Sequence, residues 1–244
     1  MGFSLDEVVP WGRSYDEYVR MFDLSEFDLG LRILGCGDGP AAFNAVLAGG
    51  GGTVLSVDPL YMFKVAQIEE RIAATCEAVL AQLRGNQNDY VWGEIASVDE
   101  LRTLRMAAME TFLADFDAGK RQGRYVAAAL PCLPFADGVF DLALSSHFLL
   151  LYSAHLSAAF HLQALQEMLR VSREVRVFPL LTLDGTPSPH LPSIKKGLQQ
   201  QGYEIETRRV PYEFQRGGNE LLIVSCVESG LTLPSSRQTL EQTF

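Results

Sequence analysis

The sequence predicts an α/β fold: a doubly wound, mostly parallel sheet of seven strands that ends in an antiparallel hairpin, with a helical insertion between the second and third strands. Short apolar runs alternate with stretches of helical periodicity along most of the chain. The last two runs, 203–210 and 220–226, alternate apolar and polar residues, which is typical of an antiparallel edge pair. The segment 61–123 is far longer than one crossover helix and has helical character.

The individual elements follow from the same two periodicities. A capping-box pattern at Ser14 and Glu17 predicts a short helix near the start of the chain. Apolar runs bounded by Gly, Pro or polar residues predict buried strands at 31–36, 53–58, 124–130, 139–146 and 174–181. Helical periodicity predicts helices over 14–22, 41–48, 62–84, 98–118 and 155–169, and a last one that stops near Gly202.

These elements predict one domain over residues 1–228, followed by a flexible Ser/Thr/Gln-rich tail over 229–244. Within the domain, we expect the insertion 61–123 to form a lid beside the ligand site, because it begins at the carboxyl edge of the sheet, directly after Asp58. Ordinary packing of the two inserted helices against the sheet edge is the alternative.

Composition narrows the class of protein. The chain has 20 basic and 30 acidic side chains and a formal net charge of −10. This balance disfavours a nucleic-acid partner, because phosphate backbones are held by clustered Lys and Arg. No apolar run reaches the roughly 18 residues of a membrane span, and no secretory signal is visible, so we expect no membrane partner. The cysteines at 36, 76, 132 and 226 lack C-x-x-C or zinc spacing. They are expected to be buried reduced thiols in a cytoplasmic protein without a metal site.

A glycine-rich loop, Gly37-Asp38-Gly39-Pro40-Ala41, follows the first predicted strand. Glycine lets the backbone approach a ligand closely, and the helix that follows offers unpaired N–H groups. Asp58 ends the second strand, where an acid accepts hydrogen bonds from a ribose diol. This combination occurs in nicotinamide dehydrogenases and in S-adenosylmethionine-dependent methyltransferases. A plain structural turn and a helix-capping aspartate are the simpler interpretations of the two features.

The second half of the chain separates these two families. The segment LPFADGVFDLALSSHFL (133–149) closely resembles the LPF-x-D-x-x-FD segment, followed by apolar residues, of class I methyltransferases. The run EMLRVSREVRVFPLL resembles the helix and fifth strand that follow it, with Ser172-Arg173 in place of the usual Lys-Pro-Gly-Gly turn, and the hairpin 203–226 looks like that fold's sixth and seventh strands. The resemblance covers 30–60 and 124–226 and implies a class I methyltransferase fold with S-adenosylmethionine as cofactor.

Residue by residue, the resemblance implies a cofactor site in the loops after the first four strands. The glycine loop would approach the methionine moiety, Asp58 would hold the ribose hydroxyls, and apolar residues after the second and third strands would border the adenine. The serines at the end of the fourth strand would face the methyl donor. The full implied set is Gly35, Gly37, Asp38, Gly39, Ala41, Asp58, Pro59, Leu60, Leu130, Ser145 and Ser146.

Three positions depart from the family pattern. Gly35 stands where the family usually carries an acid near the cofactor's amino group, Ala41 where a third glycine is usual, and Ala129 where many members have an acid for the adenine amino group. Asp38 is placed to supply some of the missing charge. The leading hypothesis is therefore methyl transfer to a small-molecule acceptor, and the alternative is a non-catalytic protein that binds S-adenosylmethionine or S-adenosylhomocysteine as a regulator or partner module. A nicotinamide-dependent oxidoreductase is a third hypothesis, disfavoured by the 133–149 segment and the hairpin.

Methyl transfer is an in-line displacement for which the protein mostly aligns the reactants, and an oxygen or nitrogen acceptor also needs a base. His147 follows the fourth strand at the point where the strand order is expected to reverse, so it is the candidate base; a hydrogen-bonded wall histidine is the alternative. For His161 and His190, a structural role is expected. Weaker candidates for the substrate pocket are Tyr152, Tyr212 and Glu213.

Overall fold

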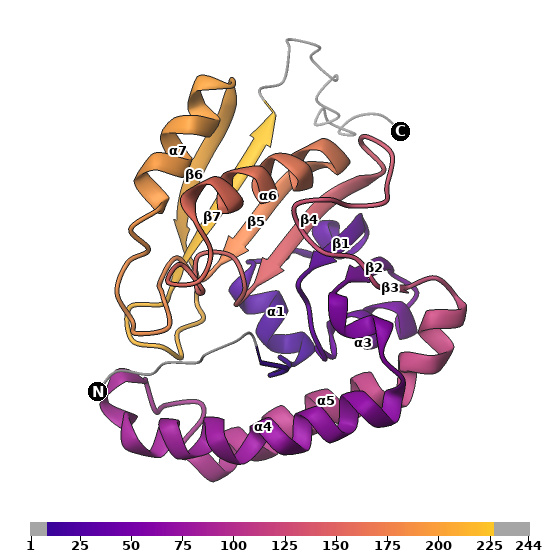
Figure 1. The fold of residues 1–244 in the computed structure, drawn as a ribbon, viewed down its shortest axis with the longest axis vertical. Coiled ribbons are helices and arrows are strands. Elements are labelled where there is room, and N and C mark those ends of the chain that lie inside the picture. The colour runs from indigo at the N-terminus through magenta and orange to yellow at the C-terminus, as the bar shows by residue number, and fades with distance from the viewer. Residues whose placement is uncertain (1–8, 227–244) are drawn as a thin grey trace, which may run out of the picture.

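The computed structural model describes residues 9–226, so the predicted tail over 229–244 lies outside the described residues. Within 9–226, seven strands form one sheet in the order β3-β2-β1-β4-β5-β7-β6 (Figure 1). β7 runs antiparallel to both of its neighbours, and the other pairs are parallel. The predicted fold class is confirmed. The strands are β1 (Arg32–Cys36), β2 (Thr53–Val57), β3 (Tyr125–Val126), β4 (Phe140–Ser146), β5 (Ser172–Phe178), β6 (Tyr203–Arg209) and β7 (Glu220–Cys226).

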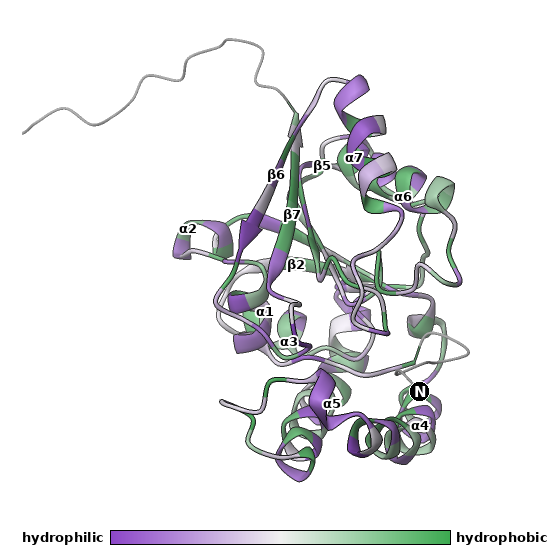
Figure 2. Ribbon diagram, turned by 90° about the vertical axis from the view of Figure 1, so that its left-hand side faces the viewer, coloured by the Kyte–Doolittle hydropathy of each residue, from purple (hydrophilic) through white to green (hydrophobic). Residues whose placement is uncertain are grey.

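Helices cover both faces of the sheet. On one face lie α1 (Tyr15–Met21), α2 (Glu26–Leu29) and α3 (Phe43–Gly49), and on the other lie α6 (Ala158–Val171) and α7 (Leu191–Gln200) (Figure 2). Each face has its own hydrophobic core, because successive strand residues point to opposite sides. Leu34 and Val175 pack with α6 and α7, whereas Ile33 and Leu144 pack with α1 and α3. The predicted capping box of α1 is present, with Ser14 and Glu17 bonded reciprocally.

The insertion forms two long helices, α4 (Val65–Gly85) and α5 (Val98–Arg121), which lie side by side beyond the carboxyl edge of the parallel strands (Figure 1). Short 3₁₀ turns, η1 (Pro59–Met62) and η2 (Gln87–Asp89), lead into α4 and follow it. α4 buries one stripe at helical spacing, which explains its amphipathic sequence: Ile68, Ile72, Cys76, Val79, Leu80 and Leu83.

Several sequence-based expectations need correction. The third strand was predicted over 124–130 but pairs only at Tyr125–Val126, because the chain then turns and Ala129 pairs locally with Cys132. The fifth strand was expected over 174–181, but it spans Ser172–Phe178 because it begins directly where α6 ends. Cys132 and Cys226 are exposed, contrary to the expectation of buried thiols, because Cys132 lies in that turn and Cys226 is the last residue of β7. α2 was not predicted, although Ser25 and Asp28 form a second capping box.

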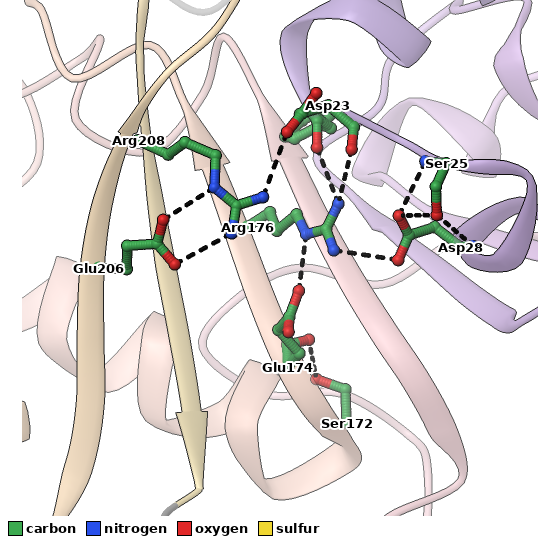
Figure 3. A network of polar contacts seen from close by, with 9 residues as sticks. Asp23, Ser25, Asp28, Ser172, Glu174, Arg176, Glu206 and Arg208 are labelled. Carbon is green, nitrogen blue, oxygen red and sulfur yellow. Dashed lines mark hydrogen bonds and ion pairs between the residues drawn. The ribbon is translucent and has the colours of Figure 1, made fainter. Parts of the chain in front are cut away.

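An arginine in the middle of the sheet anchors the α1–α2 segment (Figure 3). Arg176 of β5 is largely buried and donates to the carbonyl oxygen of Phe22 at 2.8 Å and to Asp28 Oδ1 at 3.0 Å. On the edge strand β6, Arg208 reaches Asp23 Oδ2 at 3.2 Å. These bonds attach the N-terminal helices to strands late in the chain, and α1 in turn carries residues of the site.

Candidate functional site

A cavity of about 300 Å³ opens at the edge of the sheet where β1, β2, β3 and β4 end. β1 and β4 are neighbours in the sheet although they are far apart in sequence, so the strand order reverses at this point. Ligands of open α/β sheets bind in the crevice at such a reversal. The predicted residues that line the cavity are Gly37, Asp38, Gly39, Asp58, Pro59, Leu60, Leu130, Ser146 and His147.

Gly35, Ala41 and Ser145 do not contribute to the cavity wall. Ala41 and Ser145 are buried, at 4% and 0% exposure. Gly35 lies directly behind Asp38: a Cβ on Gly35 would stand 1.7 Å from Asp38 Oδ2. The missing side chain at position 35 therefore makes room for the Asp38 carboxylate. Asp38 thus brings an acidic group next to position 35, where this sequence has glycine.

The Asp38 carboxylate is held by two hydroxyl groups and faces the cavity. Tyr18 donates to Oδ1 at 2.9 Å, and Ser56 donates to Oδ2 at 2.6 Å. Burial raises the pKa of Asp38 to about 6 in spite of these hydrogen bonds, and the neighbouring charge of Asp58 adds to the rise. The negative charge of Asp38 is thus incompletely compensated by the protein.

Asp58 connects the glycine loop to the end of β2. Its Oδ1 accepts the backbone N–H of Leu60 at 2.8 Å, and its Oδ2 accepts that of Gly39 at 2.9 Å. Burial raises the pKa of Asp58, and the two backbone bonds oppose that rise. Asp58 caps η1, which agrees with the interpretation of this residue as a helix-capping aspartate. Each of its carboxylate oxygens retains a further lone pair that a ligand can use.

The chain segment before α1 forms a wall that the sequence analysis did not predict, with Val9, Pro10, Trp11 and Arg13 at the cavity. Gly12 lies against the glycine loop so closely that a Cβ there would stand 2.1 Å from the carbonyl oxygen of Pro40. The carbonyl oxygen of Arg13 accepts the N–H of Ala42 at 2.9 Å, at the start of α3. A lone aromatic and a lone guanidinium around a glycine carry no periodic signal, which is why this wall was missed.

A second chamber of about 100 Å³ adjoins the first. The two share Val9, Trp11, Arg13 and His147. Tyr152, a predicted pocket residue, lines the second chamber, whereas Tyr212 and Glu213 contribute to neither wall. The remaining walls of the second chamber are Val79, Leu83, Tyr90, Leu151, Tyr152, Leu183, Phe214 and Gln215, so α4 and the β6–β7 loop enclose it.

His147 stands between the chambers with a backbone φ of +52°, a conformation that is uncommon for non-glycine residues. Its Nδ1 lies 2.9 Å from Ser146 Oγ, and Ser146 is also hydrogen-bonded to Tyr18. Burial, and then the charges of Arg13 and Arg105, hold the pKa of His147 well below its usual value, so the imidazole is neutral at pH 7.

The other two histidines singled out in the sequence lie elsewhere. His161 lies in α6, and His190 directly precedes α7. Their rings are 5.5 Å apart, and neither residue lines a chamber. His161 is fully buried, and His190 Nε2 lies 3.1 Å from the carbonyl oxygen of Ser153. Among residues 9–226, no group of three or more His, Cys, Asp or Glu side chains is arranged to hold a metal ion. No helix in that range is long and apolar enough to cross a membrane.

The seven-stranded order with β7 antiparallel between β5 and β6, together with a cavity beyond β1, β2 and β4, defines a class I methyltransferase fold. No protein-family model matches the sequence. The chain is 36% identical over 222 residues to the uncharacterized protein MJ0045 of Methanocaldococcus jannaschii, with 91% of this chain and 97% of that protein covered. It belongs to the same protein family as MJ0045.

Solved structures give more distant likenesses. Magnesium protoporphyrin IX methyltransferase from Synechocystis PCC 6803, solved with bound SAM, is 13% identical with a TM-score of 0.44, over 87% of this chain and 78% of that one. A SAM-dependent methyltransferase from Thermotoga maritima, described as a possible histamine N-methyltransferase, is 13% identical with a TM-score of 0.40, over 87% of this chain and 88% of that one.

Proposed function

We propose that this protein binds S-adenosylmethionine in the larger chamber and transfers its methyl group to a small molecule held in the smaller one. The observation that carries the proposal is a pair of acids, the buried Asp38 and the partly buried Asp58, at the point where the strand order reverses. Both carboxyl groups have pKa values raised by burial, so their surroundings disfavour the negative charges. A ligand with a sulfonium and an ammonium group would offset that cost.

The glycine loop supports a nucleoside ligand without a diphosphate. A dinucleotide places its pyrophosphate on free N–H groups at the start of the helix that follows the loop. Here the N–H of Ala42 donates to the carbonyl oxygen of Arg13, and the backbone of Gly12 packs against that of Pro40. The 9–14 segment therefore occupies the position that a pyrophosphate would take. Asp58 remains available to a ribose diol. These contacts favour S-adenosylmethionine over a nicotinamide cofactor.

The second chamber supports catalysis rather than binding alone. It gives an acceptor room next to the cofactor chamber, and His147 lines both. His147 Nδ1 lies 2.9 Å from Ser146 Oγ. In the tautomer in which Nδ1 donates to that oxygen, Nε2 carries a lone pair, and His147 is then a base for an acceptor O–H or N–H.

Calorimetry with S-adenosylhomocysteine and with NAD tests the cofactor assignment. We expect the wild type to bind S-adenosylhomocysteine and not NAD. Asp58→Asn should weaken this binding by roughly 1.5–3 kcal/mol, the scale of a hydrogen bond to a charged group. Asp117→Asn, at an exposed carboxylate on α5, is the matched control and should bind as the wild type does. Binding of NAD alone, or full affinity in a folded Asp58→Asn protein, would contradict the assignment.

Turnover is tested separately. The protein is incubated with methyl-labelled S-adenosylmethionine and a small-molecule extract, and labelled products are sought by mass spectrometry. We expect a labelled product that is lost in His147→Ala while S-adenosylhomocysteine binding persists. Cofactor binding without any labelled product would instead favour the regulator or partner module.

A further inference from the structure

Arg13 is a partly buried cation between the two chambers. Its Nη1 donates to the carbonyl oxygen of Trp11 at 2.6 Å, and its Nε is buried without a hydrogen-bond partner among the described residues. The side chain lines both chambers. Burial, followed by the nearby charge of Arg105, lowers the pKa of Arg13 to about 10, so the guanidinium remains charged at pH 7.

The charges around Arg13 do not balance. Arg105 and Glu17 form an ion pair in which each side chain is 1% exposed, and Tyr212 donates to Glu17 Oε1 at 2.8 Å. The carboxylate of Glu17 is therefore already engaged by Arg105. His147 is neutral, so two guanidinium groups face one carboxylate, and a net positive charge remains on the Arg13 side. Buried charges are normally paired, and a surplus cation that lines a cavity favours an anionic ligand.

The charges in the two chamber walls favour the second chamber for an anion. Arg13 interacts electrostatically with Tyr90 and Tyr152, which line only the second chamber, with Tyr18, which lines only the first, and with His147, which lines both. The acids Asp38 and Asp58, which favour a cation, lie only in the wall of the first. The cavity is thus divided into an end that favours positive charge and an end that favours negative charge.

The rest of the second chamber is apolar and aromatic. Tyr90 and Phe214 are stacked with ring centroids 4.9 Å apart, and Val79 and Leu83 of α4 add aliphatic contacts. Such walls suit a flat hydrocarbon body, while a guanidinium fork matches the geometry of a carboxylate.

We propose that Arg13 is the anion-binding group of the acceptor site, and that the methyl acceptor is a small aromatic or otherwise flat molecule carrying a carboxylate. The inference rests on the proposed function and names its substrate class. The carboxylate on Arg13 fixes the acceptor in the second chamber, and His147 stands beside the group that receives the methyl.

The test compares benzoate with benzamide, its uncharged analogue of the same shape. Dissociation constants are measured by ligand-observed NMR with the protein saturated by S-adenosylhomocysteine and again without it. We expect benzoate to bind the wild type at least about tenfold more tightly than benzamide. Arg13→Gln should remove this difference, Arg13→Lys should keep part of it, and Arg84→Gln, a control at an exposed arginine of α4, should leave it intact.

Equal binding of benzoate and benzamide to the wild type overturns the proposal, and this comparison needs no variant to fold. A second overturning result would be weaker S-adenosylhomocysteine binding by Arg13→Gln, with unchanged binding of 5′-methylthioadenosine, which lacks the amino-acid part. That result would assign Arg13 to the cofactor's carboxylate. Failure of the proposed function itself looks different, because S-adenosylhomocysteine would then not bind the wild type at all.

Discussion

Replacement of Asp38 by asparagine should stabilise the ligand-free protein at neutral pH. The pKa of Asp38 is raised from 3.8 to about 6, mainly by burial, so the folded state holds this proton more tightly than the unfolded chain. Ionised Asp38 therefore costs folding stability above pH 6, and the cost disappears below the unfolded-state value of 3.8. A shift of roughly two pH units corresponds to about 3 kcal/mol.

Asparagine keeps the shape of the side chain and one acceptor oxygen for Tyr18. Its amide nitrogen would face Ser56, whose hydroxyl also accepts from Asn44 at 3.0 Å and would have to turn. Rearranging that hydrogen bond costs about 1 kcal/mol, so the expected net gain in the free energy of unfolding at pH 7 is about 2 kcal/mol. Urea unfolding followed by circular dichroism, at a series of pH values across this window, measures the difference between the two proteins.

The expected signature is a difference in unfolding free energy that grows as the pH rises from about 4 to about 6. Asp141→Asn is a control of opposite sign. Hydrogen bonds from Arg32 lower the pKa of Asp141 to about 2, so this carboxylate stabilises the fold at neutral pH and loses that effect as the pH falls toward 2. A difference for Asp38→Asn that is independent of pH, or a loss of stability at pH 7, would refute the reasoning, including the uncompensated charge on which the cofactor assignment depends.

Two further predictions concern the insertion and the buried ion pair. Hydrogen exchange in α4 should slow when S-adenosylhomocysteine is added, and it should slow more than in β6. The reason is that α4 and the turn before it line both chambers, whereas α5 lines neither. Equal protection of α4 and β6 would make 61–123 a structural layer and not a lid. Arg105→Met should lower the free energy of unfolding by about 3–5 kcal/mol, because it leaves Glu17 charged and buried, and Arg105→Met with Glu17→Gln should cost less. Arg102→Met, at an exposed pair with Glu77, should cost at most about 1 kcal/mol, and additive effects of the Arg105 and Glu17 changes would contradict the pairing.

Much of the fold could be predicted because its signals are local. Periodicity located the strands and the two inserted helices, and the capping box placed α1. The third strand was predicted too long because its apolar residues continue into a turn, and burial in a loop produces the same apolar run as burial in a sheet.

The site was predictable only where it follows strand ends. The glycine loop, Asp58, Ser146 and His147 come together because the carboxyl ends of parallel strands share one edge. Trp11 and Arg13 could not be placed in this way, since they precede the first element and reach the cavity through contacts with the glycine loop. The role of Gly35 was also hidden, because the space it leaves is filled by a side chain three residues later.

The bonds of Glu17 fix the order in which the site can be assembled during synthesis. Its partners lie 88 residues later, at Arg105, and 195 residues later, at Tyr212. A ribosome adds residues at roughly 5–20 per second, so α1 waits on the order of ten seconds or more for its last partner to leave the exit tunnel. The nascent chain therefore has its glycine loop long before the second chamber can close, because Phe214 and Gln215 of the β6–β7 loop line that chamber.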